Sequence, residues 1–202
     1  MSTVVAVETP TGVAIAGDTL VSDGEAVSSD GFQRVFDVRG VGVGAVGETG
    51  AVQQFRQRFD VALQDREFEG EDPSDIDAVA RIAAREAERV DVDVVVGARD
   101  ADGAASLRQV GSDGRVLDNS EIALGTGSAV ALGLLEALDA GEAANDPTAA
   151  VRDVLETVME RDANTGGEVD VWTLGNEAQI TEGVRRFGEK ADEEKADEET
   201  EG

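Results

Sequence analysis

The sequence predicts an α+β protein, a four-layer αββα sandwich of two antiparallel sheets flanked by helix pairs. One observation supports this prediction and also excludes the main alternative fold. The strand-like and helix-like segments come in blocks, with strands first, then two helices, more strands, two more helices and final strands. A doubly wound parallel sheet would instead alternate single strands with single helices, so the block order excludes that fold.

The chain opens with a predicted β-hairpin. Residues 3–7 form a β-rich apolar run, residues 10–12 carry a turn signal, and residues 13–16 form a second apolar run that leads to Asp18. Chain ends are usually loose, so an apolar strand in this position suggests that the terminus is held in the fold.

Ser2 is a candidate nucleophile because of its place in the chain. Its small side chain allows methionine aminopeptidase to remove Met1, and we expect this removal. The mature chain would then carry a free α-amine and a hydroxyl on one residue. These two groups can serve as base and nucleophile.

An arginine interrupts the apolar face of the next predicted strand, which spans residues 32–38. Arg34 shares that face with Phe32, Phe36 and Val38. It must either extend to solvent at the rim of the sheet or lie buried against carboxylates.

Glycines punctuate the strand predicted for residues 41–47, where they permit close approach of a ligand to the backbone. The stretch from Gly42 to Gly47 fits G-x-G-x-x-G. It is a weak dinucleotide signature, because the glycines lie inside a strand and no βαβ unit follows.

Two helices are predicted next, over residues 48–68 and 76–90, and Ser74 precedes the second as its candidate N-cap. Large apolar residues recur at helical spacing along the first, namely Val52, Phe55, Phe59 and Leu63. The second half of the chain repeats the order, with strands at 92–97, 104–110 and 114–117, helices at 129–138 and 148–161, and strands at 169–174 and 179–181.

The composition is strongly acidic, with a net charge of -27 over 202 residues. The only lysines are Lys190 and Lys195. An excess of acidic residues with so few lysines is typical of a protein from the salt-loaded cytoplasm of a halophilic archaeon. A partly disordered polyanion is the rival interpretation, and the periodic apolar runs argue against it for residues 1–188. Such a surface disfavours binding to nucleic acid and to anionic membranes, because phosphate binding needs clustered cations.

Several residue types are missing, and their absence narrows the chemistry. Without cysteine there is no disulfide or thiolate, and without histidine the commonest general base and metal ligand is absent. We therefore expect no metal and no cofactor. No apolar stretch approaches 18 residues, so we expect a cytoplasmic protein.

Two regions are expected along the chain, a folded domain over residues 1–188 and an acidic, disordered tail over 189–202. The tail repeats Lys-Ala-Asp-Glu-Glu twice, has no large apolar residue and carries a net charge of -6.

The chain resembles a β-type subunit of the proteasome family, and it is also similar to the subunit of the bacterial two-component ATP-dependent protease. These are N-terminal nucleophile hydrolases. The resemblance covers residues 2 to about 188. With Ser2 as the first mature residue, Asp18 falls at the position of the family's catalytic aspartate and Arg34 at that of its catalytic lysine. Gly44 matches the glycine whose N–H forms the oxyanion hole.

Two further motifs carry the resemblance. Thr126-Gly127-Ser128 matches the family's Thr-Gly-Ser, which implies that Ser128 lies near the amine of the nucleophile. Residues 161–167 resemble its Arg-Asp-x-x-Ser-Gly-Gly loop, which implies supporting roles for Asp162 and Thr165. The family also implies a peptide or protein substrate, and either a homo-oligomeric ring or association with proteasome-like subunits. The helices at 48–68 and 76–90 are candidates for contact between rings.

Two departures from the family leave two functions open. The nucleophile is serine rather than threonine, and Arg34 replaces lysine. Arginine stays protonated, so the α-amine of Ser2, with a reference pKa of about 8, would have to accept the proton. Either the chain cleaves amide bonds with Ser2, or it is a catalytically silent structural or assembly subunit.

Ser2 is common after Met1 simply because it permits removal of Met1, and each of the other candidate residues has a structural explanation. Asp18 can be a turn residue, Arg34 a salt-bridge partner of Asp18, Gly44 a packing glycine, Ser128 a helix cap, and Asp162 and Thr165 loop-ordering residues.

Overall fold

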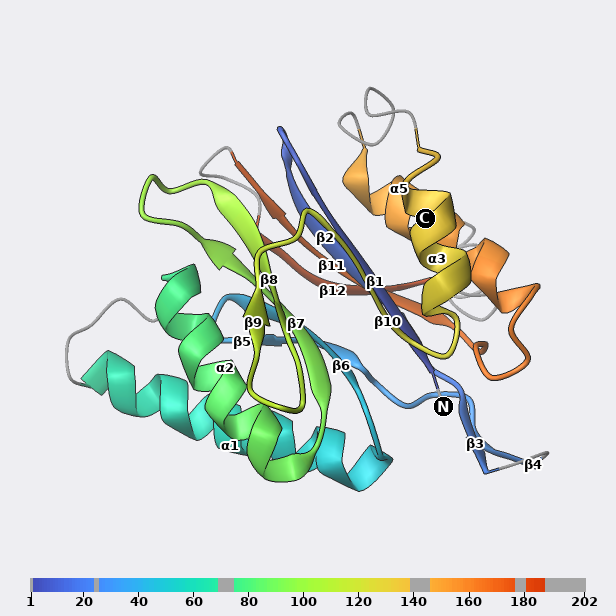
Figure 1. Cartoon of the computed structure of the whole chain (residues 1–202), viewed down its shortest axis with the longest axis horizontal. Coiled ribbons are helices and arrows are strands. Elements are labelled where there is room, and N and C mark those ends of the chain that lie inside the picture. The colour runs from blue at the N-terminus through green and yellow to red at the C-terminus, as the bar shows by residue number, and fades with distance from the viewer. Residues whose placement is uncertain (1, 24–25, 69–74, 139–145, 177–180, 188–202) are drawn as a thin grey trace, which may run out of the picture.

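The computed structural model describes residues 2–23, 26–68, 75–138, 146–176 and 181–187. They form two five-stranded antiparallel sheets, stacked face to face, and a small hairpin (Figure 1). The first sheet has the order β10-β1-β2-β11-β12, with β1 Thr3–Thr9, β2 Gly12–Asp18, β10 Glu121–Gly125, β11 Val169–Gly175 and β12 Thr181–Phe187. The second has the order β5-β6-β7-β8-β9, with β5 Val35–Val38, β6 Val41–Val46, β7 Asp93–Arg99, β8 Ala105–Val110 and β9 Val116–Leu117. The hairpin joins β3 Val21–Asp23 to β4 Ala26–Ser29.

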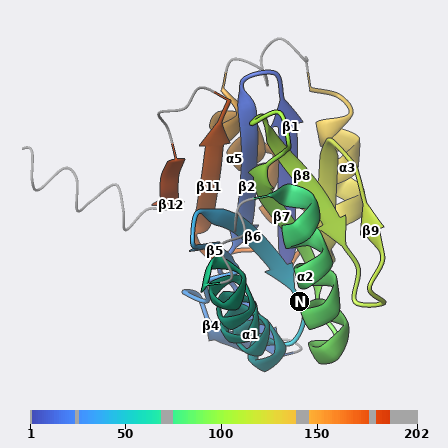
Figure 2. The same cartoon turned by 90° about the vertical axis from the view of Figure 1, so that its left-hand side faces the viewer.

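A pair of helices covers the outer face of each sheet, as Figures 1 and 2 show. Helices α1 Thr49–Phe68 and α2 Ile76–Val90 pack on the second sheet, and α3 Ser128–Leu135 and α5 Pro147–Met159 pack on the first. The apolar side chains of α1 at helical spacing are all buried. The predicted αββα sandwich is therefore confirmed. The predicted acidic tail, residues 189–202, lies outside the described residues.

Several predicted boundaries differ from the structure. The strand expected from residue 32 begins only at Val35, because the Phe32 N–H donates to the Thr19 carbonyl at 2.9 Å and holds the preceding chain against the other sheet. The N-cap of α2 is Asp75, which accepts from Ala78 N at 2.9 Å, so the prediction of Ser74 is wrong. The strand predicted for 179–181 continues to Phe187 in β12 Thr181–Phe187, and its charged side chains conceal that length in the sequence; residues 179 and 180 lie outside the described residues.

One glycine of β6 and one of β7 make room for the one tryptophan of the chain. Trp172 on β11 is fully buried between the sheets, and its indole N–H donates to the Asp37 carboxylate at 2.9 Å. Gly42 and Gly97 are cross-strand partners beneath the ring. A Cβ at Gly42 would lie 2.1 Å from the indole, and one at Gly97 would lie 2.7 Å from it. Packing therefore accounts for Gly42.

Gly42→Ala is expected to lower the free energy of unfolding by about 1–3 kcal/mol or more, because an added methyl overpacks the core against Trp172. Gly50→Ala in α1 is the matched control: a Cβ there meets nothing within 4 Å, and alanine favours the helix. Denaturant unfolding of both variants measures the difference. Equal stability of the two would contradict the packing explanation.

Among the described residues, no helix is both long and apolar enough to cross a bilayer. No group of three or more acidic residues in that part of the chain is arranged to hold a metal ion.

Candidate active site

Five segments meet at one end of the sandwich, near the label N in Figure 1. They are the start of β1, the end of β2, the residue before β5, the turn after β10 and the loop before β11. The sequence-predicted residues Asp18 and Arg34 lie here, and so do Asp162 and Thr165 of the loop.

Asp18 and Arg34 form a buried ion pair. The Arg34 Nε lies 3.4 Å from Asp18 Oδ1, and the two side chains are 2% and 0% exposed. Asp18 accepts hydrogen bonds from Thr3 N at 2.9 Å and from Gly166 N at 3.1 Å. The Arg34 Nη2 donates to the Leu20 carbonyl. Arg34 is therefore buried against a carboxylate and does not extend to solvent.

Burial shifts the pKa of both side chains in this pair. It raises the pKa of Asp18 above its ordinary value, and the positive charge of Arg34 and the N–H groups of Thr3 and Gly166 oppose that rise. It lowers the pKa of Arg34, which the charge of Asp18 opposes. Each charge thus offsets the cost of burying the other. Arginine remains a cation near neutral pH, so Arg34 supplies charge here and accepts no proton.

Thr3 joins the segments of the site, and sequence analysis missed it. Its N–H binds Asp18, and its Oγ1 lies 2.7 Å from the Thr165 hydroxyl. The same Oγ1 accepts from Gly127 N at 3.0 Å. Thr3 therefore connects the aspartate, the loop before β11 and the turn after β10. A hydroxyl residue directly after the candidate nucleophile was the available signal.

Asp162 belongs to the same hydrogen-bond network as Thr3, through Thr126 and Thr165. Its carboxylate accepts from the Thr126 hydroxyl at 2.6 Å and from the Thr165 hydroxyl at 2.7 Å. Partial burial raises the pKa of Asp162, but these bonds and those from Asn164 outweigh it, so the pKa is lowered overall. The carboxylate therefore stays ionised and holds the Thr165 hydroxyl toward Thr3.

Ser2 is buried beside this network, with 1% of its surface exposed. Its carbonyl accepts from Thr126 N at 3.0 Å. Gly125, at a φ of +93°, lies so close that a Cβ would stand 1.9 Å from the Ser2 carbonyl oxygen. This glycine therefore lets the turn approach the first residues of the chain.

Gly44 and Ser128 are less closely tied to the site. Gly44 lies inside β6, between Val35 and Val95, and a Cβ there would stand 2.6 Å from Val4. Packing alone explains this glycine, so its oxyanion role stays a prediction. Ser128 is the first residue of α3, whose N-cap is Gly127 with no side-chain cap bond. The interpretation of Ser128 as a helix cap is therefore wrong, and its place near the amine stays a prediction.

Thr3→Val keeps the β-branched shape but removes the hydroxyl that accepts from Gly127 N. Leaving that buried N–H without a partner is expected to cost about 1–3 kcal/mol of unfolding free energy. Thr3→Ser, which keeps the hydroxyl, is the control and should retain most of the stability. Chemical denaturation measures both. A valine variant as stable as wild type would show that the hydroxyl is dispensable.

A search of curated proteins finds no match to this chain. The model of the family described as "Proteasome subunit" matches residues 1–174. The match covers the second sheet, the first sheet except β12 and the last residue of β11, and helices α1, α2, α3 and α5, and it includes every residue of the network around Thr3. The chain therefore belongs to the proteasome subunit family.

Proposed function

We propose that this chain is an N-terminal nucleophile hydrolase subunit that cleaves peptide bonds with Ser2 after removal of Met1. The observation that carries the proposal is the buried Asp18–Arg34 pair, whose Asp18 accepts a hydrogen bond from the N–H of Thr3, the residue directly after Ser2. A buried ion pair is costly to keep, and groups with shifted pKa values, such as these two, cluster at functional sites. Family membership supports the same chemistry.

In the proposed mechanism the free α-amine of Ser2 takes the proton from the Ser2 hydroxyl. The resulting oxygen attacks the substrate carbonyl, and the tetrahedral intermediate collapses to an ester on Ser2 as the amine leaving group takes up a proton. Water then hydrolyses the ester. Arg34 would stabilise the developing negative charge, and the Gly44 N–H is the proposed oxyanion donor. Asp18 holds Arg34, and Ser128, Asp162 and Thr165 are proposed to orient the amine.

A catalytically silent subunit is the second candidate, and one observation favours it. Arg34 cannot exchange a proton as the family's lysine can, and a structural role of Arg34 as partner of Asp18 would account for its burial. The family's fold would then serve assembly alone.

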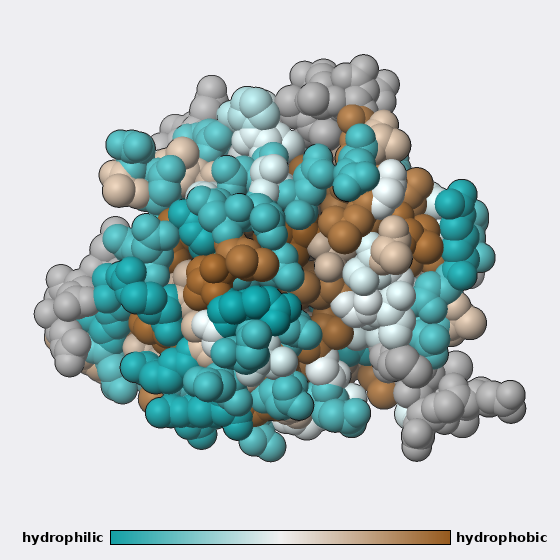
Figure 3. Space-filling model, viewed as in Figure 1, coloured by the Kyte–Doolittle hydropathy of each residue, from teal (hydrophilic) through white to brown (hydrophobic). Residues whose placement is uncertain are grey.

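We further propose that the subunit assembles into a ring, with copies of itself or with proteasome-like subunits, in a salt-rich cytoplasm. In the view of Figure 3, hydrophobic side chains gather over α3, where Leu132 is exposed, whereas hydrophilic side chains cover most of α1 and α2, although Val61 and Phe68 of α1 are also exposed. Obligate interfaces are more apolar than the rest of the surface, which favours α3 as the larger contact. Helices α1 and α2 would make a more polar contact.

The mature N-terminus and its reactivity test the proposal. Mass spectrometry of the purified protein should show loss of Met1, and a β-lactone probe should form an ester that maps to Ser2. Retained Met1, or a chain without Met1 that takes up no probe and cleaves no peptide in molar salt, would leave the silent subunit as the function.

A further inference from the structure

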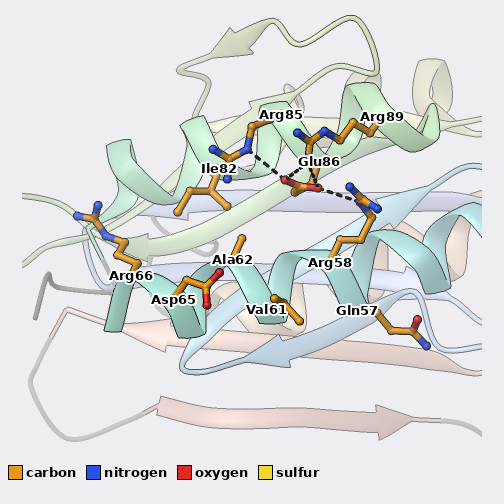
Figure 4. Close-up of a pocket in the computed structure, with 10 residues that line it drawn as sticks. All are labelled: Gln57, Arg58, Val61, Ala62, Asp65, Arg66, Ile82, Arg85, Glu86 and Arg89. Carbon is orange, nitrogen blue, oxygen red and sulfur yellow. Dashed lines mark hydrogen bonds and ion pairs between the residues drawn. The ribbon is translucent and has the colours of Figure 1, made fainter. Parts of the chain in front are cut away.

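Four arginines line a hollow between α1 and α2 on a chain that is otherwise strongly acidic. Arg58 and Arg66 come from α1, and Arg85 and Arg89 come from α2, around a cavity volume of about 680 Å³ (Figure 4). We call this the arginine hollow. Four arginines and two carboxylates, Asp65 and Glu86, line it, whereas the whole chain carries a net charge of -27. The hollow is therefore a place where an anion is attracted.

Glu86 at the base of the hollow holds three of these arginines. It is 3% exposed and accepts from Arg58 Nε at 2.9 Å, Arg85 Nε at 3.1 Å and Arg89 Nη1 at 2.9 Å. Burial raises the pKa of Glu86, but these bonds outweigh it, so the pKa is lowered and Glu86 stays ionised.

One carboxylate cannot satisfy three guanidinium groups. Each guanidinium carries five N–H donors, whereas a carboxylate offers about four acceptor positions. The arginine side chains are about half exposed, at 46%, 57% and 51% for Arg58, Arg85 and Arg89. Glu86 therefore fixes the guanidinium groups in place and leaves donors for a second carboxylate.

We propose that the arginine hollow binds the acidic C-terminal segment of this same chain, residues 189–202. This segment holds eight acidic residues, in a repeat that places the triplets Asp192–Glu194 and Asp197–Glu199 five positions apart. Five positions of extended chain span about 17 Å. Arg58 and Arg66 stand eight positions apart on α1, about 12 Å along the helix. The two triplets can therefore reach the two ends of the hollow, where Figure 4 places Arg66 apart from the Glu86 cluster.

The segment must pass around the edge of the sandwich to reach the hollow in its own molecule. The last described residue, Phe187, ends the edge strand β12, which contacts β5 of the other sheet, and the Phe187 ring packs on the α5 side, 5.4 Å from the guanidinium carbon of Arg152. Helix α1 packs on β5 as well. The 20 residues of α1 span about 30 Å. An extended chain from Phe187 reaches about 17 Å at Asp192 and about 40 Å at Glu199, so the second triplet has the longer reach toward the hollow.

A peptide with the sequence of residues 189–202 tests this proposal. The labelled peptide is titrated, by fluorescence anisotropy at fixed salt, into a chain truncated after Gly188 and into the full chain. Saturable binding to the truncated chain is expected. Binding to the full chain should be at least about tenfold weaker, because the tethered segment competes at a high effective concentration.

Matched arginine variants of the truncated chain locate the binding. Arg85→Gln should weaken the peptide about tenfold through loss of a charged hydrogen bond, and Arg66→Gln should also weaken it while leaving the Glu86 bonds intact. Arg115→Gln, at an exposed arginine outside the hollow, should leave the affinity unchanged. Circular dichroism confirms that each variant folds.

Three results would overturn the proposal. They are absence of binding to the truncated chain, equal binding by the full and truncated chains, and equal binding of a peptide whose Asp and Glu are replaced by Asn and Gln. If the first or second occurs, an acidic segment of another subunit becomes the remaining occupant. These outcomes do not depend on whether Ser2 is catalytic, because no readout involves turnover.

Discussion

Ser2→Ala is expected to abolish covalent labelling by a β-lactone and to lower peptide hydrolysis by about 10⁴-fold or more, because the nucleophile is lost. The substitution removes a single hydroxyl at the start of β1. The Ser2 carbonyl still accepts from Thr126 N, so the fold and the free energy of unfolding should change little. Peptide hydrolysis, probe labelling and denaturant unfolding are measured on the same preparation.

Separate variants distinguish the hydroxyl from the amine. A chain with extra residues fused before Met1 keeps the Ser2 hydroxyl but has no free amine at that position. It should be as inactive as Ser2→Ala, because Arg34 cannot replace the amine as the proton acceptor. Full activity in the extended chain would show that another base operates. Activity that survives Ser2→Ala would show that the nucleophile lies elsewhere.

The block order of strands and helices was sufficient to predict the sandwich, because each apolar run carries its own periodicity. The approach of Arg34 to Asp18 could also be predicted, since one residue ends a strand and the other interrupts an apolar face. The role of Thr3 could not be. Its hydroxyl meets Thr165, 162 positions away, and no local pattern encodes such a contact.

Two other features of the structure also could not be predicted from local sequence patterns. Strand β12 has polar and charged residues on an edge, where burial imposes no alternation, so its extension to Phe187 was not predicted. Glu86 lies on the buried face of α2 with Ala83 and Ala87, and a carboxylate there contradicts the helical pattern. Only the three arginines that converge on it from two helices make that position tolerable.

Arg34→Ala is expected to lower the free energy of unfolding by about 3–5 kcal/mol, because it leaves the buried Asp18 carboxylate without its counter-charge. The loss should be accompanied by loss of hydrolysis. Arg115→Ala, which removes an exposed arginine from its pair with Asp113, is the control and should change stability little. Thermal and denaturant unfolding measure both.

Arg34→Lys separates charge from proton exchange at the same position. Lysine keeps a positive charge beside Asp18, so the loss of stability should be much smaller than with alanine. Burial lowers the pKa of a lysine, which allows it to exchange protons as arginine cannot. If the chain is a hydrolase, Arg34→Lys should therefore maintain or raise the rate of peptide hydrolysis. If wild type and Arg34→Lys are both inactive with Met1 removed, the Asp18–Arg34 pair serves the fold alone, and the subunit acts in assembly.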